Sequence, residues 1–348
     1  MAGYRRRFDA LFAAYFDGLR ESLDAPGLSR FTPRCLDLLR DHSLRGGKRL
    51  RVAFLHEAAR LVTDDDVPGL DAAALSVELL HTHGLVHDDL IDDSPVRRGG
   101  PSAYYAYREE FPGHPGTALG LTVLAGDLAA FLSLRVLLDA ELPSTLRQAM
   151  LDVQVRAASD AVLGQIVDLE RDFPPLPGED FLHTVSEYKS ARYSILAPLR
   201  MGLIAAGANP ARHDARLRRY AVLVGIAEQM RDDYLDLFGD EETTGKPVGT
   251  DLRDGRHTYT VRALLDGTTG AEHSAVTSAL GDPHCPAETV ERLRDLARAR
   301  GIDAALRSRT REYARAASAE AASWRPYWRE DAVAFFETLP LWGAERTR

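Results

Sequence analysis

The sequence predicts an all-α protein, a bundle of roughly ten or more helices. Over long stretches apolar residues recur at three- and four-residue spacing, which is the period of an amphipathic helix. Ala, Leu and Arg, all good helix formers, are the most frequent residues. No run of β-branched residues alternates with polar ones for long enough to predict a strand. Two clear helical patterns are Phe8, Leu11, Phe12, Tyr15 and Leu19, and Leu217, Tyr220, Ala221, Val224 and Ile226.

The helical stretches are separated by short segments in which Gly and Pro cluster. The composition does not change across any of these breaks, so the sequence predicts a single domain over residues 1–348. The breaks lie at residues 68–69, 111–116, 174–178, 245–255 and 267–286.

Composition excludes several classes of protein. The 348 residues are 45% hydrophobic and 27% charged, as in globular proteins, and the net charge of −9 argues against a nucleic-acid partner. Two cysteines, Cys35 and Cys285, predict neither a disulfide framework nor a thiolate zinc site. The most apolar stretch, 117–138, is interrupted by Asp127 and Arg135, so we interpret it as a buried helix and expect no membrane span. We expect a cytoplasmic protein.

Two acidic clusters, HDDLIDD at 87–93 and QMRDDYLD at 229–236, each contain the pattern DDxxD. On a helix the first and last aspartates of each pattern project from one face, about 6 Å apart along the axis. Two carboxylates at that distance repel by roughly 2–3 kcal/mol at an effective dielectric constant near 20. Apolar helices tolerate this repulsion poorly unless a cation lies between the carboxylates. A single DDxxD is more often a solvated helix end, but two copies favour binding of Mg²⁺ or Mn²⁺ through oxygen ligands.

A basic segment follows each acidic cluster. RRGGP occupies 97–101, and GKP at 245–247 is followed by Arg256. A third basic segment, GGKRLR at 46–51, precedes both clusters. Glycine lets a backbone approach a phosphate closely while Lys and Arg neutralise its charge. Any one segment could be a solvated loop, but together they indicate a diphosphate held between metal ions and basic side chains.

Six motifs in order resemble the trans-isoprenyl diphosphate synthases (polyprenyl synthetases), and bacterial geranylgeranyl diphosphate synthases in particular. The motifs are GGKRLR, HDDLID with RRG downstream, GQIVD at 164–168, KSA at 189–191, QMRDDYLD and GKPVGTDLRDGR, and they cover residues 46–256. The resemblance implies the isoprenoid synthase fold, an all-α bundle around a deep central cavity, in a homodimer. It also implies that the two aspartate motifs face each other across the cavity mouth.

The implied reaction condenses isopentenyl diphosphate with an allylic diphosphate, which is dimethylallyl, geranyl or farnesyl diphosphate. Three Mg²⁺ ions are expected, with Mn²⁺ as an alternative. Ionisation of the allylic diphosphate, attack by the alkene and loss of a proton would lengthen the chain by one isoprene unit. An apolar pocket is needed to keep water from the carbocation.

The resemblance also assigns roles to individual residues. The metal ligands would be Asp88, Asp92 and Asp232, supported by Asp89, Asp233 and Asp236. The isopentenyl diphosphate ligands would be Gly47, Lys48, Arg51, His81 and Arg98. The allylic diphosphate ligands would be Arg97, Lys189, Lys246 and Arg256. Ser190 and Gln229 would present oxygens to the developing allylic cation, although Ser190 and Arg256 stand where Thr and Lys are common in the family.

Product length in this family depends on the residues one turn before the first DDxxD, which lie beside the elongating chain. Here these residues are His83 and Gly84, with Leu80 one turn deeper. Gly leaves the tunnel open and His obstructs it less than an aromatic pair would. We therefore predict a twenty-carbon product, geranylgeranyl diphosphate, over farnesyl or longer polyprenyl diphosphates.

Three other functions compete with this prediction. A class I terpene cyclase shares the fold, but it pairs one DDxxD with an Asn/Ser/Glu triad and has no use for Lys48 and Arg51. An HD-type phosphohydrolase would use His87 and Asp88 but gives the second acidic cluster no role. A non-catalytic partner subunit should have lost part of an aspartate motif, and both motifs are intact here.

Overall fold

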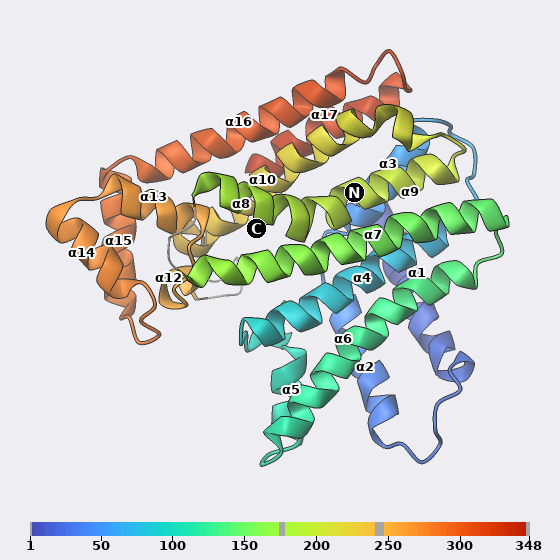
Figure 1. Cartoon of the computed structure of the whole chain (residues 1–348), viewed down its shortest axis with the longest axis horizontal. Coiled ribbons are helices and arrows are strands. Elements are labelled where there is room, and N and C mark those ends of the chain that lie inside the picture. The colour runs from blue at the N-terminus through green and yellow to red at the C-terminus, as the bar shows by residue number, and fades with distance from the viewer. Residues whose placement is uncertain (1, 174–177, 241–246, 346–348) are drawn as a thin grey trace. The chain divides into compact units, whose positions relative to one another are not determined.

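The computed structural model describes residues 2–173, 178–240 and 247–345, and these are almost entirely helical (Figure 1). The prediction of an all-α fold is confirmed. The described chain divides into two compact units, Met1–Ser159 with Tyr193–Arg212, and Asp160–Arg192 with His213–Arg348. The single domain over residues 1–348 stays a prediction.

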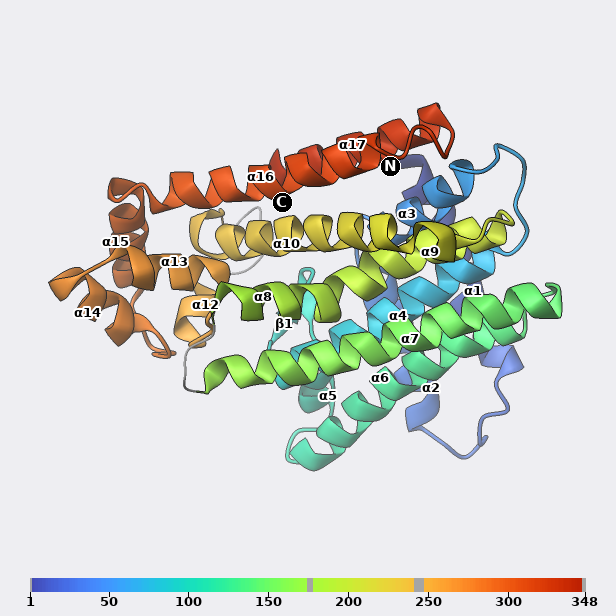
Figure 2. The same cartoon turned by 45° about the horizontal axis from the view of Figure 1, so that its top comes forward.

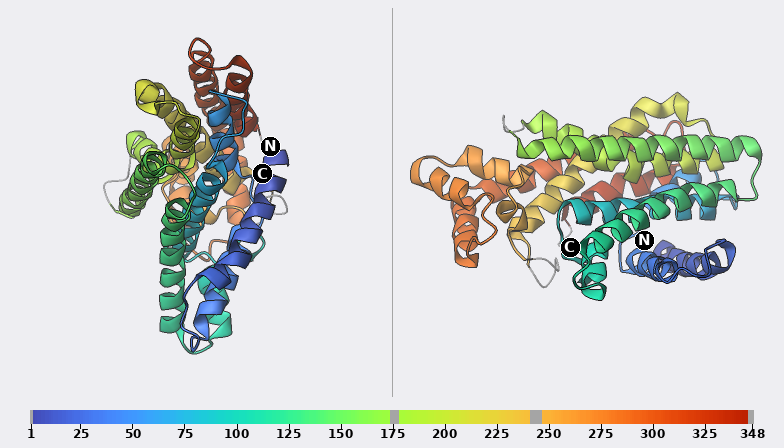
Figure 3. Two further views of the ribbon diagram at one scale, coloured as in Figure 1. Left: turned by 90° about the vertical axis from the view of Figure 1, so that its right-hand side faces the viewer. Right: turned by 60° about the horizontal axis from the view of Figure 1, so that its bottom comes forward.

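The first unit is built from the N-terminal helices, a very short hairpin and one later helix. Its elements are α1 (Ala2–Ser22), α2 (Phe31–Leu44), α3 (Leu50–Arg60), α4 (Leu70–Ile91), β1 (Val96–Arg97), β2 (Gly100–Pro101), α5 (Ala103–Glu110), α6 (Pro115–Leu138), most of α7 (Ser144–Leu169), α9 (Ala197–Ala205) and nearly all of the 3-10 turn η3 (Pro210–His213). In it α1 packs beside α2, α3 beside α9, and α4 beside α5 and α6 (Figure 3).

The hairpin is the one sheet in the described chain, and the sequence did not predict it. Val96 pairs with Pro101 and Arg97 with Gly100, in antiparallel register. Arg98 and Gly99 form the two-residue turn, with φ of 51° and 75°. Positive φ at both turn positions is the geometry that matches the twist of a hairpin. The hairpin therefore fixes two adjacent arginines, Arg97 at the end of β1 and Arg98 in the turn.

Close packing of α3 on α9 depends on Gly202. A Cβ at this position would lie 2.8 Å from the Cβ of Ala58 and closer still to the Leu55 carbonyl oxygen. The two helices therefore touch backbone to backbone, which no larger residue permits. This contact brings the start of α9, and the residues just before it, against α3.

Helix α6 is apolar on all sides but buried on only one. Small residues such as Ala125 and Ala129 are buried, whereas Leu124 and Phe131 are more than 60% exposed. Length and composition would allow Pro115–Leu138 to cross a membrane, and 39% of its most apolar window is buried. The prediction of a buried helix is thus right for one face only.

The second unit is organised around one long helix, α10 (Asp214–Phe238). Helices α16 (Ile302–Ala322) and α17 (Glu330–Glu345) lie side by side along it (Figure 2). Tyr220, Trp324 and Phe336 form their shared aromatic core, and the Tyr220 hydroxyl donates to the Phe336 carbonyl at 3.0 Å. The other elements are η1 (Glu170–Asp172), α8 (Glu179–Val185), η2 (Ser186–Leu196) as far as Arg192, α12 (Thr250–Arg253), α13 (Tyr259–Gly267), α14 (Gly270–Ala279) and α15 (Ala287–Ala299).

Candidate functional site

The first acidic motif forms the last turn of α4. Asp88 and Asp89 belong to the helix, and Asp92 caps its C-terminal end, with its amide donating to the Asp88 carbonyl at 2.8 Å. Negative side chains are unfavourable at this end of a helix, because the backbone dipole is negative there as well. The arrangement therefore needs positive charge nearby, from the protein or from a ligand.

Arg97 of the hairpin supplies part of that charge. Its Nε donates to both oxygens of Asp89, at 2.8 and 3.1 Å, and its Nη2 also contacts Asp89. The Asp89 side chain is only 1% exposed. Burial by itself would lower the pKa of Arg97, but the bonds to Asp89 outweigh it and raise the pKa above its usual value. Asp89 is thus held by Arg97, while Asp88 and Asp92 stay accessible, with Asp88 Oδ2 3.6 Å from Arg97.

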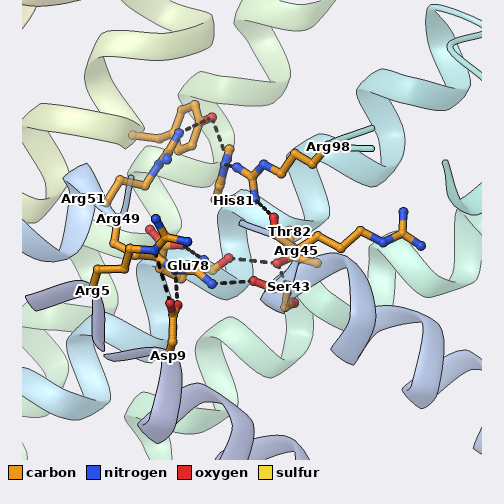
Figure 4. Close-up of polar contacts among 11 residues, drawn as sticks. Arg5, Asp9, Ser43, Arg45, Arg49, Arg51, Glu78, His81, Thr82 and Arg98 are labelled. Atoms are coloured by element: carbon orange, nitrogen blue, oxygen red, sulfur yellow. Dashed lines mark hydrogen bonds and ion pairs between the residues drawn. The ribbon is translucent and has the colours of Figure 1, made fainter. Parts of the chain in front are cut away.

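Three of the predicted isopentenyl diphosphate ligands, Arg51, His81 and Arg98, lie close together in the first unit (Figure 4). Gly46, Gly47 and Arg49 all have positive φ, so the loop before α3 is tightly turned. A Cβ on Gly47 would lie 3.3 Å from Nη1 of Arg98, so glycine leaves room for that guanidinium. Arg98 donates to the Arg45 carbonyl at 3.1 Å and lies 3.3 Å from Nε2 of His81. Lys48 lies half-buried on the same loop.

Burial and mutual repulsion both disfavour the positive charges of this cluster. The pKa of Arg98 is lowered to about 10, first by burial and then by Arg49, Arg51 and Arg97, against the attraction of Glu78. The pKa of His81 is lowered well below 6.5, first by burial and then by Arg51 and Arg98. An anion bound between these side chains would relieve the repulsion, because each cation would gain an opposite charge.

Arg49, in the middle of the GGKRLR motif, is structural. Its guanidinium donates to Glu78 at 2.6 Å, to Asp9 at 2.8 Å and to the Ser43 carbonyl at 2.7 Å. The side chains of Arg49 and Glu78 are each only 2% exposed. This network, drawn in Figure 4, ties the loop to α1, α2 and α4, and so fixes the basic side chains on either side of it.

The predicted chain-length residues line α4 one to two turns before Asp88. His83 Nδ1 lies 3.0 Å from the Gly126 carbonyl of α6, and its ring packs edge-on against His87. A Cβ on Gly84 would meet no atom within 4 Å, whereas Leu80 is buried. The space beside Gly84 is therefore open, and His83 is held toward α6.

The second acidic motif lies in the last two turns of α10. Asp233 is buried, and its carboxylate accepts from Gln229 Nε2 at 2.8 Å and from the Tyr259 amide at 3.0 Å. Burial, followed by the charge of Asp251, raises the pKa of Asp233 well above its usual value. Asp232 is exposed, and Asp236 is half-buried. In both motifs, therefore, the middle aspartate turns inward while the first and last remain accessible.

The loop after α10 is tied back to this motif. Asp236 Oδ2 accepts from the Asp251 amide at 3.1 Å. Arg256, a predicted allylic diphosphate ligand, lies in the same segment, where its Nε is 3.4 Å from Asp254 and its amide donates to the Asp251 carbonyl. Lys246 lies outside the described residues. The resemblance assigned no role to Asp251, although this residue belongs to the GKPVGTDLRDGR motif.

Lys189 and Ser190 lie in η2, a π-helix, a geometry common at functional sites. Lys189 Nζ donates to Asp168 Oδ2 at 2.7 Å, and Asp168 also accepts from Arg171 at 2.8 Å. Asp168, the last residue of GQIVD, thus holds the lysine, a role that the sequence analysis missed. At Gly164 a Cβ would lie 2.6 Å from Lys189 Cα, so the backbones of α7 and η2 touch there.

Mg²⁺ fits the accessible aspartates by the chemistry of its ligands. Among the described residues no group of three or more His, Cys, Asp or Glu side chains is already placed to hold a metal ion. Mg²⁺ typically takes one or two carboxylates and completes its shell with water and substrate phosphate oxygens. Paired aspartates with basic side chains nearby therefore suit this ion better than a closed protein cage would.

Comparisons with known proteins identify the family of this chain. The polyprenyl synthetase family model matches residues 33–296. The chain is 31% identical to a short chain isoprenyl diphosphate synthase of Methanothermobacter thermautotrophicus, covering 78% of this chain and 79% of that one. It is 33% identical to the geranylgeranyl diphosphate synthase of Sulfolobus acidocaldarius, covering 74% and 75%. Other matched relatives are named farnesyl diphosphate synthases.

The fold also matches a solved structure. The geranylgeranyl pyrophosphate synthase of Corynebacterium glutamicum, solved with isoprenyl diphosphate and magnesium, superposes with a TM-score of 0.88 at 24% identity, over 99% of this chain and 98% of that one. The family model and the relatives confirm the resemblance drawn from the ordered motifs. The chain belongs to the polyprenyl synthetase family and is a trans-prenyl diphosphate synthase, an enzyme of the transferase class.

Proposed function

We propose that this enzyme makes geranylgeranyl diphosphate by adding isopentenyl diphosphate to an allylic diphosphate in the presence of Mg²⁺. The observation that carries the product length is the open space beside Gly84, one turn before the first aspartate motif. Relatives named for geranylgeranyl diphosphate support it, although others are named for farnesyl diphosphate.

In the proposed mechanism, basic side chains hold and neutralise the two diphosphates. Arg51, Arg98 and Lys48 bind isopentenyl diphosphate, with neutral His81 between the arginines. Lys189, held by Asp168, faces the charge that develops on the departing allylic diphosphate. The allylic C–O bond breaks, the alkene attacks the resulting carbocation, and a proton leaves to the released diphosphate.

Three Mg²⁺ ions are proposed to bind the accessible aspartates of the two motifs. The residues concerned are Asp88, Asp92, Asp232 and Asp236. When bound, the metal supplies positive charge that stabilises the leaving diphosphate. Asp89 and Asp233 act less directly in this proposal, because Arg97, Gln229 and the Tyr259 amide already occupy their oxygens.

The growing chain is proposed to pass Gly84 along α4. Leu80, one turn deeper and buried, would stop it. His83 contributes less, because its ring is held by the Gly126 carbonyl and by His87. A chain of twenty carbons is the length that this floor predicts.

Product analysis tests the proposal. The purified enzyme is incubated with Mg²⁺, isopentenyl diphosphate and each of dimethylallyl, geranyl and farnesyl diphosphate, and products are identified by mass. A single twenty-carbon diphosphate is expected; a shorter or longer one would refute the chain-length argument but not the reaction. A hydrocarbon product, or no condensation with any starter, would instead favour the cyclase or partner-subunit function.

Two variants locate the floor of the tunnel. Gly84→Phe should shorten the product, because the ring fills the open space, and His83→Ala should lengthen it only a little, because the His83 ring is held toward α6. Gly18→Phe is the matched control, since Gly18 lies exposed on α1 with no atom near its Cβ position. Unchanged products from both α4 variants would place the floor elsewhere.

We also propose a homodimer, and a cytoplasmic location. Leu124 and Phe131 lie on the exposed apolar face of α6, and such a face on a globular protein typically marks an interface. A second copy of the chain would cover it. Light scattering of Phe131→Glu, which should be smaller in mass than the wild type, tests the dimer. Both cysteines are free and buried, as suits a reducing compartment.

A further inference from the structure

Tyr193 lies at the centre of the basic cluster, although no motif drew attention to it. Its hydroxyl oxygen is 3.0 Å from Nη2 of Arg51 and 3.3 Å from Nδ1 of His81. The guanidinium of Arg51 also lies over its ring, 5.0 Å from the centroid. All of these residues, with Ser194 and Arg98, belong to the first unit.

Arg98 determines where the single proton of His81 lies. Nη2 of Arg98 is 3.3 Å from Nε2 of His81, and a guanidinium can only donate. Nε2 must therefore accept, because a hydrogen on both atoms would set donor against donor. His81 is neutral in this buried, cationic setting, so its one proton lies on Nδ1 and points at Tyr193.

The hydroxyl oxygen of Tyr193 thus accepts two hydrogen bonds, from Arg51 and from His81. Two lone pairs are all that a phenol oxygen offers, so its acceptor capacity is filled. Its own hydrogen has no acceptor among the contacts of the described chain. The hydroxyl hydrogen of Tyr193, which lies among positively charged side chains, is therefore a donor available for an anionic ligand.

We propose that Tyr193 is a further ligand of isopentenyl diphosphate, donating its hydroxyl hydrogen to a phosphate oxygen while its oxygen holds Arg51 and His81. The inference rests on the proposed binding of isopentenyl diphosphate to this cluster. Arg51 uses Nη2 on Tyr193 and on Ser194, at 3.0 and 2.8 Å. Tyr193 therefore links the two faces of the subsite, α3 and α4, through one oxygen.

Tyr193→Phe tests the donor, because it keeps the ring and its contact with Arg51 and removes only the hydroxyl. A lost hydrogen bond to a charged group predicts a rise of roughly 10- to 100-fold in KM for isopentenyl diphosphate. The KM for the allylic diphosphate should stay within about threefold. Calorimetric titration with isopentenyl diphosphate alone should show the same weakening in Kd.

Two controls separate direct binding from positioning. Ser194→Ala removes the other acceptor of Arg51 but leaves the Tyr193 hydrogen in place, so its effect on KM should be clearly smaller. Tyr15→Phe removes a hydroxyl from a half-buried tyrosine of α1 and should leave both KM values unchanged. Urea melts check that each variant is folded.

The outcomes are distinguishable. Equal effects of Tyr193→Phe and Ser194→Ala would overturn direct donation, since both would then act only by loosening Arg51. If Tyr193→Phe still catalyses condensation with an unchanged KM and Kd for isopentenyl diphosphate, the role of Tyr193 is refuted but the proposed function is not. Absence of condensation by the wild-type enzyme would instead refute the proposed function.

Discussion

Substituting Gly164 by alanine should strongly reduce the catalytic activity of the enzyme without unfolding it. The added Cβ would lie 2.6 Å from both Lys189 Cα and the Tyr188 carbonyl carbon, and closer to the Lys189 amide nitrogen. Carbon atoms pack at 3.5–4.0 Å, so η2 must move away from α7 by about 1 Å. Because Lys189 is part of η2, its ammonium group would move away from the position that the hydrogen bond to Asp168 sets.

A displacement of about 1 Å in a positioning group typically costs ~10²-fold in rate. We therefore expect kcat/KM for the allylic diphosphate to fall ~10²-fold, about 2.7 kcal/mol of transition-state stabilisation. Overpacking should cost about 1–3 kcal/mol of folding stability, offset by about 1 kcal/mol from the better helix propensity of alanine. The loss of activity should thus exceed any loss of stability.

The assay measures kcat/KM with the allylic diphosphate varied at saturating isopentenyl diphosphate, alongside urea melts. Gly18→Ala is the matched control, a helical glycine of α1 whose Cβ position is empty. It should keep wild-type activity and gain about 0.5–1 kcal/mol of stability. If Gly164→Ala kept kcat/KM within threefold of the wild type, the close approach of η2 would not position Lys189 for catalysis.

Three further predictions concern stability and the metal. Arg49→Met should destabilise the fold by about 3–5 kcal/mol in urea melts, because Glu78 is left as a buried charge, and adding Glu78→Met should restore most of the loss. Burial, followed by neighbouring arginines, lowers the pKa of His42 to about 4 in the folded protein. As the pH falls, the unfolded chain therefore binds a proton on this histidine before the folded protein does. Wild type should therefore lose about 2 kcal/mol more stability than His42→Gln between pH 7.5 and 5, and equal slopes would contradict the burial argument. Asp88→Asn should abolish most Mg²⁺-dependent activity with little change in stability, whereas Asp89→Asn should destabilise the fold by removing the buried charge that pairs with Arg97; identical effects would refute the distinction between the two aspartates.

Helices and motifs were predictable because their signals are local. The spacing of Phe8, Phe12 and Leu19 defines a helix face wherever the helix packs, and all three are buried. The order of the six motifs is likewise a property of the chain alone. It predicted the family, which the relatives confirm.

Long-range pairings were not predictable in the same way. The DDxxD pattern does not predict which aspartate is buried. The burial of each aspartate depends on how α4 and α10 are rotated against the helices packed on them. Arg97 and Asp89 meet because the chain turns back between α4 and β1, where Asp93 has a φ of 47°. Tyr193 is separated from Arg51 by 142 residues, so nothing near it in sequence announces the contact.

The backbone contact at Gly202 has a consequence for how this protein can change over generations. Any side chain there must part α9 from α3, and residues 193 and 194 adjoin α9 while Arg51 lies on α3. A substitution at Gly202 would therefore increase the distances from Arg51 to Tyr193 and Ser194. Selection on substrate binding should thus hold Gly202 nearly invariant among descendants, while exposed positions of the same unit, such as Gly18, are free to vary.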